Sequence, residues 1–249
     1  MIELEHLRKK FGDFQAVKDV TLQIPPGEIF GFLGPNGAGK TTTIRMMAGL
    51  MRPTSGRVFL DGKDVMRQPE EAKAILGFIP DRPYLYEKLT GQEFLDFIAD
   101  LHGLETGIAR QKRIEELLNF FDLSEWSQEL VESFSHGMRQ RLVIAAALLP
   151  RPKVLIIDEP MVGLDPKGAR LVKGLLRDLA KKGVSIFMST HTLELAEEVC
   201  HRIGILNEGR VIALGTMEEL REKAKTTDAR LEPLFLKLTG EEAAGEFRA

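Results

Sequence analysis

The chain has 249 residues, of which 34 are basic and 37 acidic, and 43% are hydrophobic. This length and composition suffice for one sizeable α/β core, with or without a subdomain. The near balance of charge argues against a polycationic nucleic-acid-binding surface, and we expect no nucleic-acid partner. The single cysteine, Cys200, excludes an internal disulfide framework and suits a reducing compartment. We interpret it as a small core residue at the end of a helix.

The apolar segments of the chain predict its location. Residues 1–5 alternate polar and apolar side chains and lack the apolar core of a signal peptide. The longest apolar run, residues 142–150, is far shorter than the about 20 residues that cross a bilayer. We therefore expect a protein that is made and kept in the cytosol.

The first elements predicted are strands. Residues 2–7 and 20–24 alternate with a period of two, as half-buried strands do. Phe11, which lies between them beside a glycine, suits stacking against a purine ring; the alternative is a core phenylalanine in a hairpin. Residues 56–62 predict a strand that ends in an Asp-Gly turn, and residues 75–80 a strand that Pro80 stops.

Residues 34–41, GPNGAGKT, match the P-loop pattern G-x-x-x-x-G-K-[ST]. A predicted strand, residues 28–33, precedes the motif, and a predicted helix, residues 42–48, follows it. Glycines let the loop curl so that backbone N–H groups point at phosphate oxygens. Lys40 would reach the β- and γ-phosphates, and the Thr41 hydroxyl would ligate Mg²⁺. The expected loop comprises Gly34, Pro35, Asn36, Gly37, Ala38, Gly39, Lys40, Thr41 and Thr42.

Between residues 88 and 150 the period changes to 3.6, which predicts an inserted helical region. Residues 90–93 form a capping box, after which one buried face is predicted from Phe94, Phe97, Ile98 and Leu101. A second helix would bury Ile114, Leu117, Leu118 and Phe121. Trp126, Tyr84 and Tyr86 fall near the junction of the two subdomains, where an apolar patch could receive another protein. For Trp126 we favour core packing over that alternative.

Candidate catalytic residues follow two later strands. Residues 154–159, VLIIDE, read as a buried parallel strand that brings Asp158 and Glu159 to its carboxyl end, where ligands bind in open α/β sheets. Because successive side chains point to opposite sides, Asp158 would hold Mg²⁺ while Glu159 polarises an attacking water. His191 ends a strand over residues 184–190 at the same edge. A lone histidine is usually structural, but we place this one beside the γ-phosphate.

The rest of the chain continues the α/β pattern. Residues 163–166 predict a turn and residues 171–179 a helix. A hairpin is built on residues 207–209, and a short helix is capped by Thr216 and Glu219. From about residue 225 we expect a docking helix, with apolar residues at 231, 234, 235 and 238, and then a frayed tail.

The segments GPNGAGKTT, VLIIDEP, GLDP and STH, in this order and spacing, resemble the ATP-binding subunits of ABC transporters over nearly the whole chain. The resemblance implies an α/β fold: a P-loop NTPase core with a mainly parallel sheet, an N-terminal antiparallel β subdomain and an inserted helical subdomain. The ATPase domain would span residues 1–225, with the insertion at about 88–150 and a C-terminal extension at 226–249. By the same resemblance Phe11 stacks on adenine, Asp165 lies in the D-loop, Glu159 is the catalytic glutamate and His191 the switch histidine.

The resemblance also implies partners. In the family two such domains, two copies or two homologous subunits, face each other head to tail and trap two ATP molecules, each between one P-loop and the opposite signature segment. Closure on ATP would drive a separate membrane-spanning permease, which would hold the chain at the inner face of the cell membrane. The cofactors implied are ATP and Mg²⁺. The SHGMRQR segment resembles subunits of bacterial exporters.

Two segments depart from the family pattern. Its usual signature, LSGGQ, is FSHGM here, at residues 134–138. Ser135 and Gly137 are retained, so a hydroxyl and a helix amino terminus can face a γ-phosphate. His136 replaces a glycine, which predicts either weaker contacts to ATP across the dimer or an imidazole beside phosphate. Asp81 stands where the family has the glutamine of its Q-loop, and its carboxylate suits Mg²⁺.

Two other functions compete with a transport ATPase. A soluble ABC-type ATPase that acts on ribosomes or DNA would favour two cassettes, a long coiled coil or a basic face, and the sequence has none of them. A regulatory module that binds nucleotide without hydrolysis is supported by the altered signature. The intact set of Lys40, Asp158, Glu159 and His191 opposes that reading.

Overall fold

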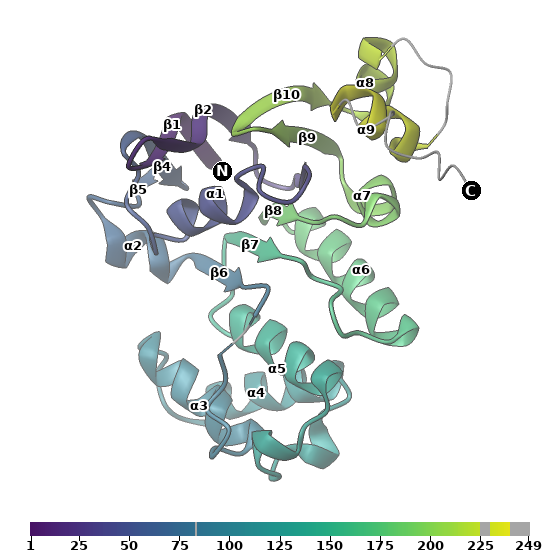
Figure 1. Cartoon of the computed structure of the whole chain (residues 1–249). Helices are drawn as coiled ribbons and strands as arrows, with labels where there is room; N and C mark the ends of the chain where they lie inside the picture. The colour runs from purple at the N-terminus through teal and green to yellow at the C-terminus, as the bar shows by residue number, and fades with distance from the viewer. Residues whose placement is uncertain (83, 225–229, 240–249) are drawn as a thin grey trace.

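The computed structural model of the chain describes residues 1–82, 84–224 and 230–239, and it is built around two sheets (Figure 1). The strands are β1 (Ile2–Phe11), β2 (Phe14–Ile24), β3 (Ile29–Leu33), β4 (Ser55–Leu60), β5 (Lys63–Asp64), β6 (Leu76–Ile79), β7 (Val154–Asp158), β8 (Ser185–Ser189), β9 (Arg202–Asn207) and β10 (Arg210–Gly215). The α-helices are α1 (Lys40–Met47), α2 (Pro69–Ala74), α3 (Gly91–Leu101), α4 (Ile108–Phe120), α5 (His136–Leu148), α6 (Pro166–Lys181), α7 (Leu193–Val199), α8 (Met217–Ala224) and α9 (Leu231–Thr239).

The smaller sheet has the strand order β2-β1-β4-β5 and is antiparallel throughout. Strands β1 and β2 form a long hairpin in which Ile2 pairs with Ile24 and Phe11 with Phe14. Their alternating apolar side chains face the core, as the period of two predicts. The expected N-terminal antiparallel unit is confirmed, with strands longer than the sequence pattern indicated.

The larger sheet has the order β10-β9-β3-β8-β7-β6. The five strands from β9 to β6 are parallel, and β10 joins the edge as an antiparallel strand through the predicted hairpin. All residues of β3, β7 and β8 are buried, because both faces of the sheet are covered. Along β8, Ile186 and Met188 pack with helices on one face, whereas Phe187 packs toward the smaller sheet on the other.

Helix α1 packs between the two sheets (Figure 1). Its Ile44, Met46 and Met47 are fully buried among residues of the smaller sheet and Phe30, Phe32 and Phe187 of the larger one. Its amino end therefore lies at the carboxyl end of β3, where the P-loop connects strand to helix. The packing fixes the loop in place from both sides.

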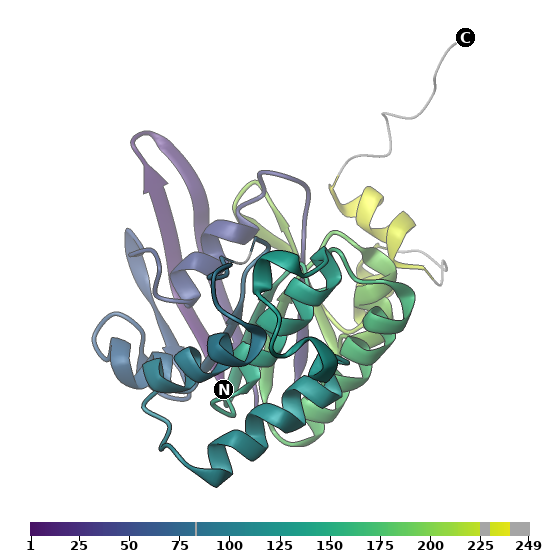
Figure 2. The same ribbon diagram turned by 90° about the horizontal axis from the view of Figure 1, so that it is seen from below.

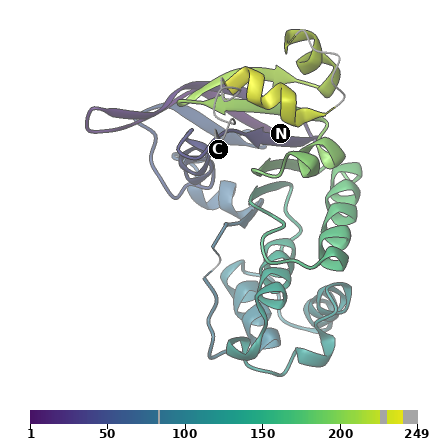
Figure 3. The same ribbon diagram turned by 45° about the vertical axis from the view of Figure 1, so that its right-hand side comes forward.

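The helical region, α3 to α5, forms the lower part of the molecule and projects in front of the sheets when seen from below (Figures 2 and 3). It shares one core with the larger sheet. The predicted capping box is present: Glu93 N donates to Thr90 Oγ1 at 3.1 Å, and Thr90 N donates to Glu93 Oε2 at 2.8 Å. The buried side of α4, with Ile114, Leu117, Leu118 and then Phe121, is confirmed.

Two predictions for the helical region were wrong. Leu101 is 67% exposed, because the buried face of α3 is centred on Phe94, Leu95 and Ala99 and so is turned away from Leu101. Trp126 is 46% exposed rather than in the core. It ends the 3₁₀ turn Ser124–Trp126, and the neighbouring Leu123 fills the core instead.

The C-terminal elements cover the β9–β10 edge of the larger sheet. The cap of α8 is as predicted, with Thr216 N donating to Glu219 Oε2 at 2.9 Å. Helix α9 is the expected docking helix, since Leu231, Leu234 and Phe235 are buried against residues of α7, β9 and β10. The predicted frayed tail lies outside the described residues. None of the described helices has the length and apolar character needed to span a membrane.

Candidate nucleotide-binding site

A cavity of about 510 Å³ opens where the P-loop meets the carboxyl ends of β7 and β8. Its volume lies in the usual range for small-molecule sites. Eleven of the residues singled out from the sequence line it: Phe11, Asn36, Gly37, Gly39, Lys40, Thr41, Thr42, Asp81, Asp158, Glu159 and His191. The fold thus brings together residues that are up to 180 positions apart in the chain.

The P-loop backbone depends on glycine at two points. Gly39 has a φ of +108°, and a Cβ there would lie 2.5 Å from the carbonyl oxygen of Ala16. A Cβ on Gly34 would lie 2.2 Å from the carbonyl oxygen of Leu206. Gly34, Pro35 and Ala38 do not line the cavity; Gly34 lies against Leu206, and Ala38 is buried in the core. The loop therefore presents backbone N–H groups at the amino end of α1.

Lys40 bends back over the loop, where its Nζ donates to the carbonyl oxygens of Gly34, at 2.5 Å, and Pro35, at 3.1 Å. Burial lowers the pKa of Lys40, and the carboxylates of Glu159 and Asp158 counteract that shift. The ammonium group is therefore already inside the site, within the field of both acids.

Asp158 ends β7 and is buried. Its Oδ1 accepts a hydrogen bond from Ser189 Oγ on β8. Burial raises the pKa of Asp158, the hydrogen bond from Ser189 opposes this, and the charge of Asp81 raises it further. The Thr41 hydroxyl is near enough to the carboxylate to lower its pKa slightly. A cation bound in the cavity would offset the repulsion between the carboxylates of Asp158 and Asp81.

Glu159 has a φ of +55°, a left-handed backbone that turns its side chain toward β8. Its Oε1 lies 2.8 Å from His191 Nδ1, and its Oε2 accepts from Thr190 Oγ1 at 3.2 Å. Asp158 and Glu159 thus point to different partners, as alternation along a strand requires.

Two aromatic rings stand at the outer rim of the cavity. Phe11 and Phe14 are 46% and 65% exposed at the tip of the β1–β2 hairpin, so Phe11 is not a core residue. Lys9 Nζ lies 5.0 Å from the centre of the Phe11 ring. The sequence analysis did not identify Phe14 as a residue of this site. Its position directly after Gly12-Asp13, opposite Phe11 in the hairpin, is the feature that could have indicated it.

Three other predicted residues do not line this cavity: Ser135, Gly137 and Asp165. Ser135 caps α5, its Oγ accepting from Met138 N at 3.3 Å, and Asp165 caps α6, its Oδ1 accepting from Gly168 N at 2.8 Å. Both helix starts lie close together, because a Cβ on Gly137 would be 2.9 Å from the carbonyl oxygen of Gly163.

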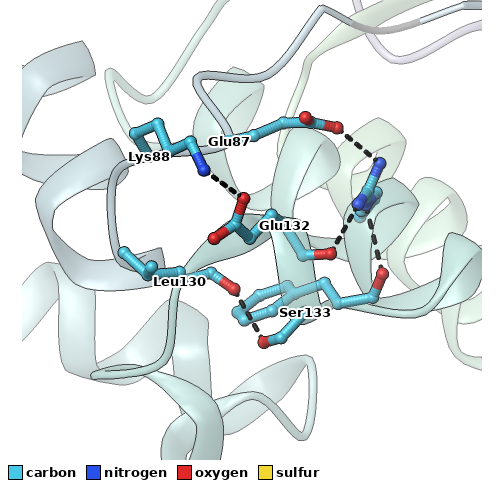
Figure 4. A network of polar contacts seen from close by, with 7 residues as sticks. Glu87, Lys88, Leu130, Glu132 and Ser133 are labelled. Atoms are coloured by element: carbon cyan, nitrogen blue, oxygen red, sulfur yellow. Dashed lines mark hydrogen bonds and ion pairs between the residues drawn. The ribbon is translucent and has the colours of Figure 1, made fainter.

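A polar network holds the start of α5 to the segment after β6. The Arg139 guanidinium donates to a carboxylate oxygen of Glu87 at 2.9 Å and to the carbonyl oxygens of Glu132, at 2.8 Å, and Phe134, at 3.1 Å. Lys88 Nζ lies 2.5 Å from Glu132 Oε2, alongside Glu87 (Figure 4). The altered signature segment is therefore fixed by its neighbours in the same chain.

Sequence comparisons agree with this geometry. The profile of the family described as "ABC transporter" matches residues 17–162. The chain is 38% identical over 220 residues to the linearmycin resistance ATP-binding protein LnrL of Bacillus subtilis (strain 168), covering 88% of this chain and 70% of that protein. It is 40% identical over 231 residues to the ABC-type transporter ATP-binding protein EcsA of the same organism, covering 93% of each.

Structural comparisons give the same family. A solved ATP-binding subunit of an ABC transporter superimposes with a TM-score of 0.91 at 35% identity, covering 96% of this chain and 99% of that one. The dimeric post-hydrolysis state of the cassette MJ0796, bound to ADP and Pi, superimposes with a TM-score of 0.78 at 28% identity, covering 87% and 98%.

The fold and the cavity define a P-loop nucleotide-binding protein. The chain belongs to the ABC transporter family, in which it is an ATP-binding subunit that hydrolyses ATP. The fold class and the family resemblance indicated by the sequence are confirmed.

Proposed function

We propose that the cavity binds ATP with Mg²⁺ and that different residues of the cavity bind the nucleotide and catalyse its hydrolysis. Phe11 stacks on the adenine, and the P-loop amides with Lys40 hold the phosphates. The observation that carries the proposal is the contact between Glu159 and His191, made at the carboxyl edge of the sheet and on the same cavity as Lys40. An isolated strand end with two solvated acids would not produce this arrangement.

The oxygen donors in the cavity fit Mg²⁺. Thr41, Asp81 and Asp158 line the same cavity, and the charge of Asp81 is close enough to raise the pKa of Asp158. Hard oxygen ligands of this kind suit a small divalent cation. We assign Thr41, Asp158 and Asp81 to the metal, which when bound neutralises charge on the phosphates.

Glu159 positions the attacking water, because its carboxylate is held at both oxygens yet borders the cavity. His191 is 69% exposed at its side chain, so its second ring nitrogen is free to face a γ-phosphate while Nδ1 contacts Glu159. From that position the imidazole contacts the transferring phosphoryl group, whose developing negative charge the site must stabilise.

The second half of each ATP site comes from another subunit in this proposal. Ser135, Gly137 and Asp165 lie off the chain's own cavity, at helix starts that can face the phosphates bound by a second copy or a homologous subunit. Support comes from the dimeric form of the related cassette MJ0796. Closure on ATP and opening after hydrolysis would then be the two states that do mechanical work.

The proposed partner is a membrane-spanning permease, to which the chain binds at the inner face of the cell membrane. Family membership supports this assignment, and the name of the relative LnrL, a resistance protein, supports an exporter. The proposed ATPase unit is residues 1–225, followed by the extension 226–249. The exposed Tyr84 and Tyr86, which contact each other edge to face, remain our predicted docking point for another protein.

The experiment that tests the proposal compares the wild-type chain with Glu159→Gln in Mg²⁺-ATP, following phosphate release and molar mass by light scattering. We expect turnover in the wild type, and in the variant an ATP-dependent dimer with hydrolysis at least 100-fold slower. Glu115→Gln, on the exposed side of α4, is the matched control and should behave as wild type. Wild-type turnover by Glu159→Gln would remove Glu159 from the mechanism. ATP binding without turnover or dimer in either protein would favour the regulatory module.

A further inference from the structure

A second cavity, of about 670 Å³, opens between the helical region and the core. It is bounded by α4, the C-terminal part of α6 and the segments that lead into β7 and β8. Those segments enter the amino ends of the two strands, whereas Asp158 ends β7 and His191 follows the carboxyl end of β8. The cavity therefore lies at the edge of the sheet opposite the nucleotide site and shares no lining residue with it.

Apolar side chains form the walls of this cavity. Leu117 and Leu148 are buried, Leu175 and Leu179 are half-buried, and Phe120 is exposed at its mouth. Part of this apolar surface therefore remains open to water in a cavity that opens to solvent. A ligand with an apolar body would gain free energy by covering it.

The polar side chains of the cavity are mostly basic. Four basic residues line it, Arg113, Arg151, Lys153 and Lys182, against two acidic ones, Glu116 and Asp178. Lys153 is engaged elsewhere, with its Nζ 3.0 Å from Asp61 Oδ2, and Asp178 lies 3.8 Å from Lys181. For Arg151 and Lys182, no salt bridge or side-chain hydrogen bond occurs within the described part of the chain. The cavity is left with uncompensated positive charge.

Arg113 is the most constrained of these groups. Its Nη2 donates to the carbonyl oxygen of Leu148 at 3.1 Å, and its Nη1 is 3.8 Å from Glu116 Oε2. Its Nε is buried with no partner among the residues described. Burial, and then the charge of Arg151, lower the pKa of Arg113. The two guanidinium groups lie close enough for their like charges to interact unfavourably, and an anion bound between them would relieve that repulsion.

Arg151 is held at the cavity by a strained backbone. Its φ of +54° lies in the left-handed region, which a long side chain adopts at a cost in free energy. The turn is closed by Arg151 N, which donates to the carbonyl oxygen of Leu148 at 3.1 Å. Arg113 and Arg151 thus both bind the end of α5 and bring their charges to one edge of the cavity.

We propose that this cavity binds an organic carboxylate with an aryl or alkyl body. The carboxylate lies between Arg113 and Arg151, where guanidinium groups match its planar geometry, and the apolar body covers Phe120 and Leu175. A singly charged ligand is favoured over a phosphate dianion, because Glu116 and Asp178 line the same space and repel a second charge.

Calorimetric titration of the full 249-residue chain tests the proposal with four probes. These are 4-phenylbutyrate, its neutral counterpart 4-phenyl-1-butanol, its cationic counterpart 4-phenylbutylamine, and inorganic phosphate. We expect the carboxylate to bind at least tenfold more tightly than the other three, with or without saturating Mg²⁺-ATP. If the alcohol binds as tightly as the carboxylate, the cavity is an apolar pocket without a carboxylate site. If phosphate binds more tightly than the carboxylate, the cavity is only a charged surface. Either result overturns the proposal.

Variants locate the site. Arg151→Asn removes the charge with a residue that tolerates the left-handed backbone, and we expect it to weaken 4-phenylbutyrate binding at least tenfold. Arg113→Gln should do the same, and Lys112→Gln, an exposed neighbour on α4, should not. If Arg113→Gln does not fold, Arg151→Glu replaces it and should prefer 4-phenylbutylamine to 4-phenylbutyrate. Wild-type affinity for the carboxylate in Arg151→Asn would show that the site does not exist.

Discussion

His191 Nδ1 lies 2.8 Å from Glu159 Oε1, and the two residues follow the carboxyl ends of the neighbouring parallel strands β8 and β7. The contact joins the group proposed to position water to the group proposed to stabilise the γ-phosphate. The sheet holds both residues at the same edge, where its parallel strands end. Thr190 adds a second hydrogen bond to the same carboxylate.

We expect His191→Ala to lower ATP turnover by about 100-fold or more, since it removes a donor that acts on developing charge. Binding of ATP should change little, because the P-loop and Lys40 remain. Steady-state kinetics beside equilibrium binding of a fluorescent ATP analogue separates the two effects. A variant with lost affinity and unchanged turnover would place His191 in binding rather than in catalysis.

Asp158→Asn should stabilise the nucleotide-free chain near neutral pH. Burial raises the pKa of Asp158 in the folded state above its pKa in the unfolded chain. Folding therefore takes up a proton at this carboxyl group when the pH is above the unfolded-state pKa. The group then destabilises the folded state, and this effect grows as the pH rises. An asparagine still accepts the hydrogen bond from Ser189 without carrying the charge. Urea unfolding at pH 7 should show a gain of about 1 kcal/mol.

The gain should disappear at pH 3, where aspartate is largely protonated in both states. The same variant should lose Mg²⁺-dependent hydrolysis. A destabilised Asp158→Asn at pH 7, with no difference between the two pH values, would contradict the prediction.

Gly163→Ala should destabilise the chain by about 1–3 kcal/mol. Gly163 has a φ of +77°, and a Cβ there would lie 1.8 Å from His136 Nδ1. Adding His136→Gly to Gly163→Ala removes the clash and leaves only the backbone strain, so part of the stability should return. Urea unfolding of both single variants and the double variant measures the coupling. Strictly additive effects would show that the imidazole does not occupy this space.

Cys200 should react slowly with thiol reagents in the folded protein. Burial raises the pKa of its thiol to about 12, so almost no thiolate is present at pH 8. Labelling with a disulfide reagent should be at least 100-fold faster in about 6 M guanidinium, which unfolds the chain and exposes the thiol. Equal rates in both conditions would show that the Cys200 thiol is open to solvent in the folded protein.

The sequence by itself determined the elements whose cause is local. The P-loop needs glycine at fixed points of one short loop, and the period of two or of 3.6 follows from one face of a strand or helix. The cap at Thr90, the hairpin before Arg210 and the acids at the end of β7 were therefore predicted correctly. Family-specific spacing then extended these motifs to an ABC ATPase.

The tertiary structure alone decided which faces meet. The helical period does not say where the buried face of α3 is centred, so Leu101 was misplaced, and a short 3₁₀ turn put Trp126 at the surface. Strand order is set by crossovers rather than by local pattern, and it is what brings His191 to Glu159. The approach of Arg113 to Arg151 has the same origin: long-range packing places two charges together that no local sequence rule connects.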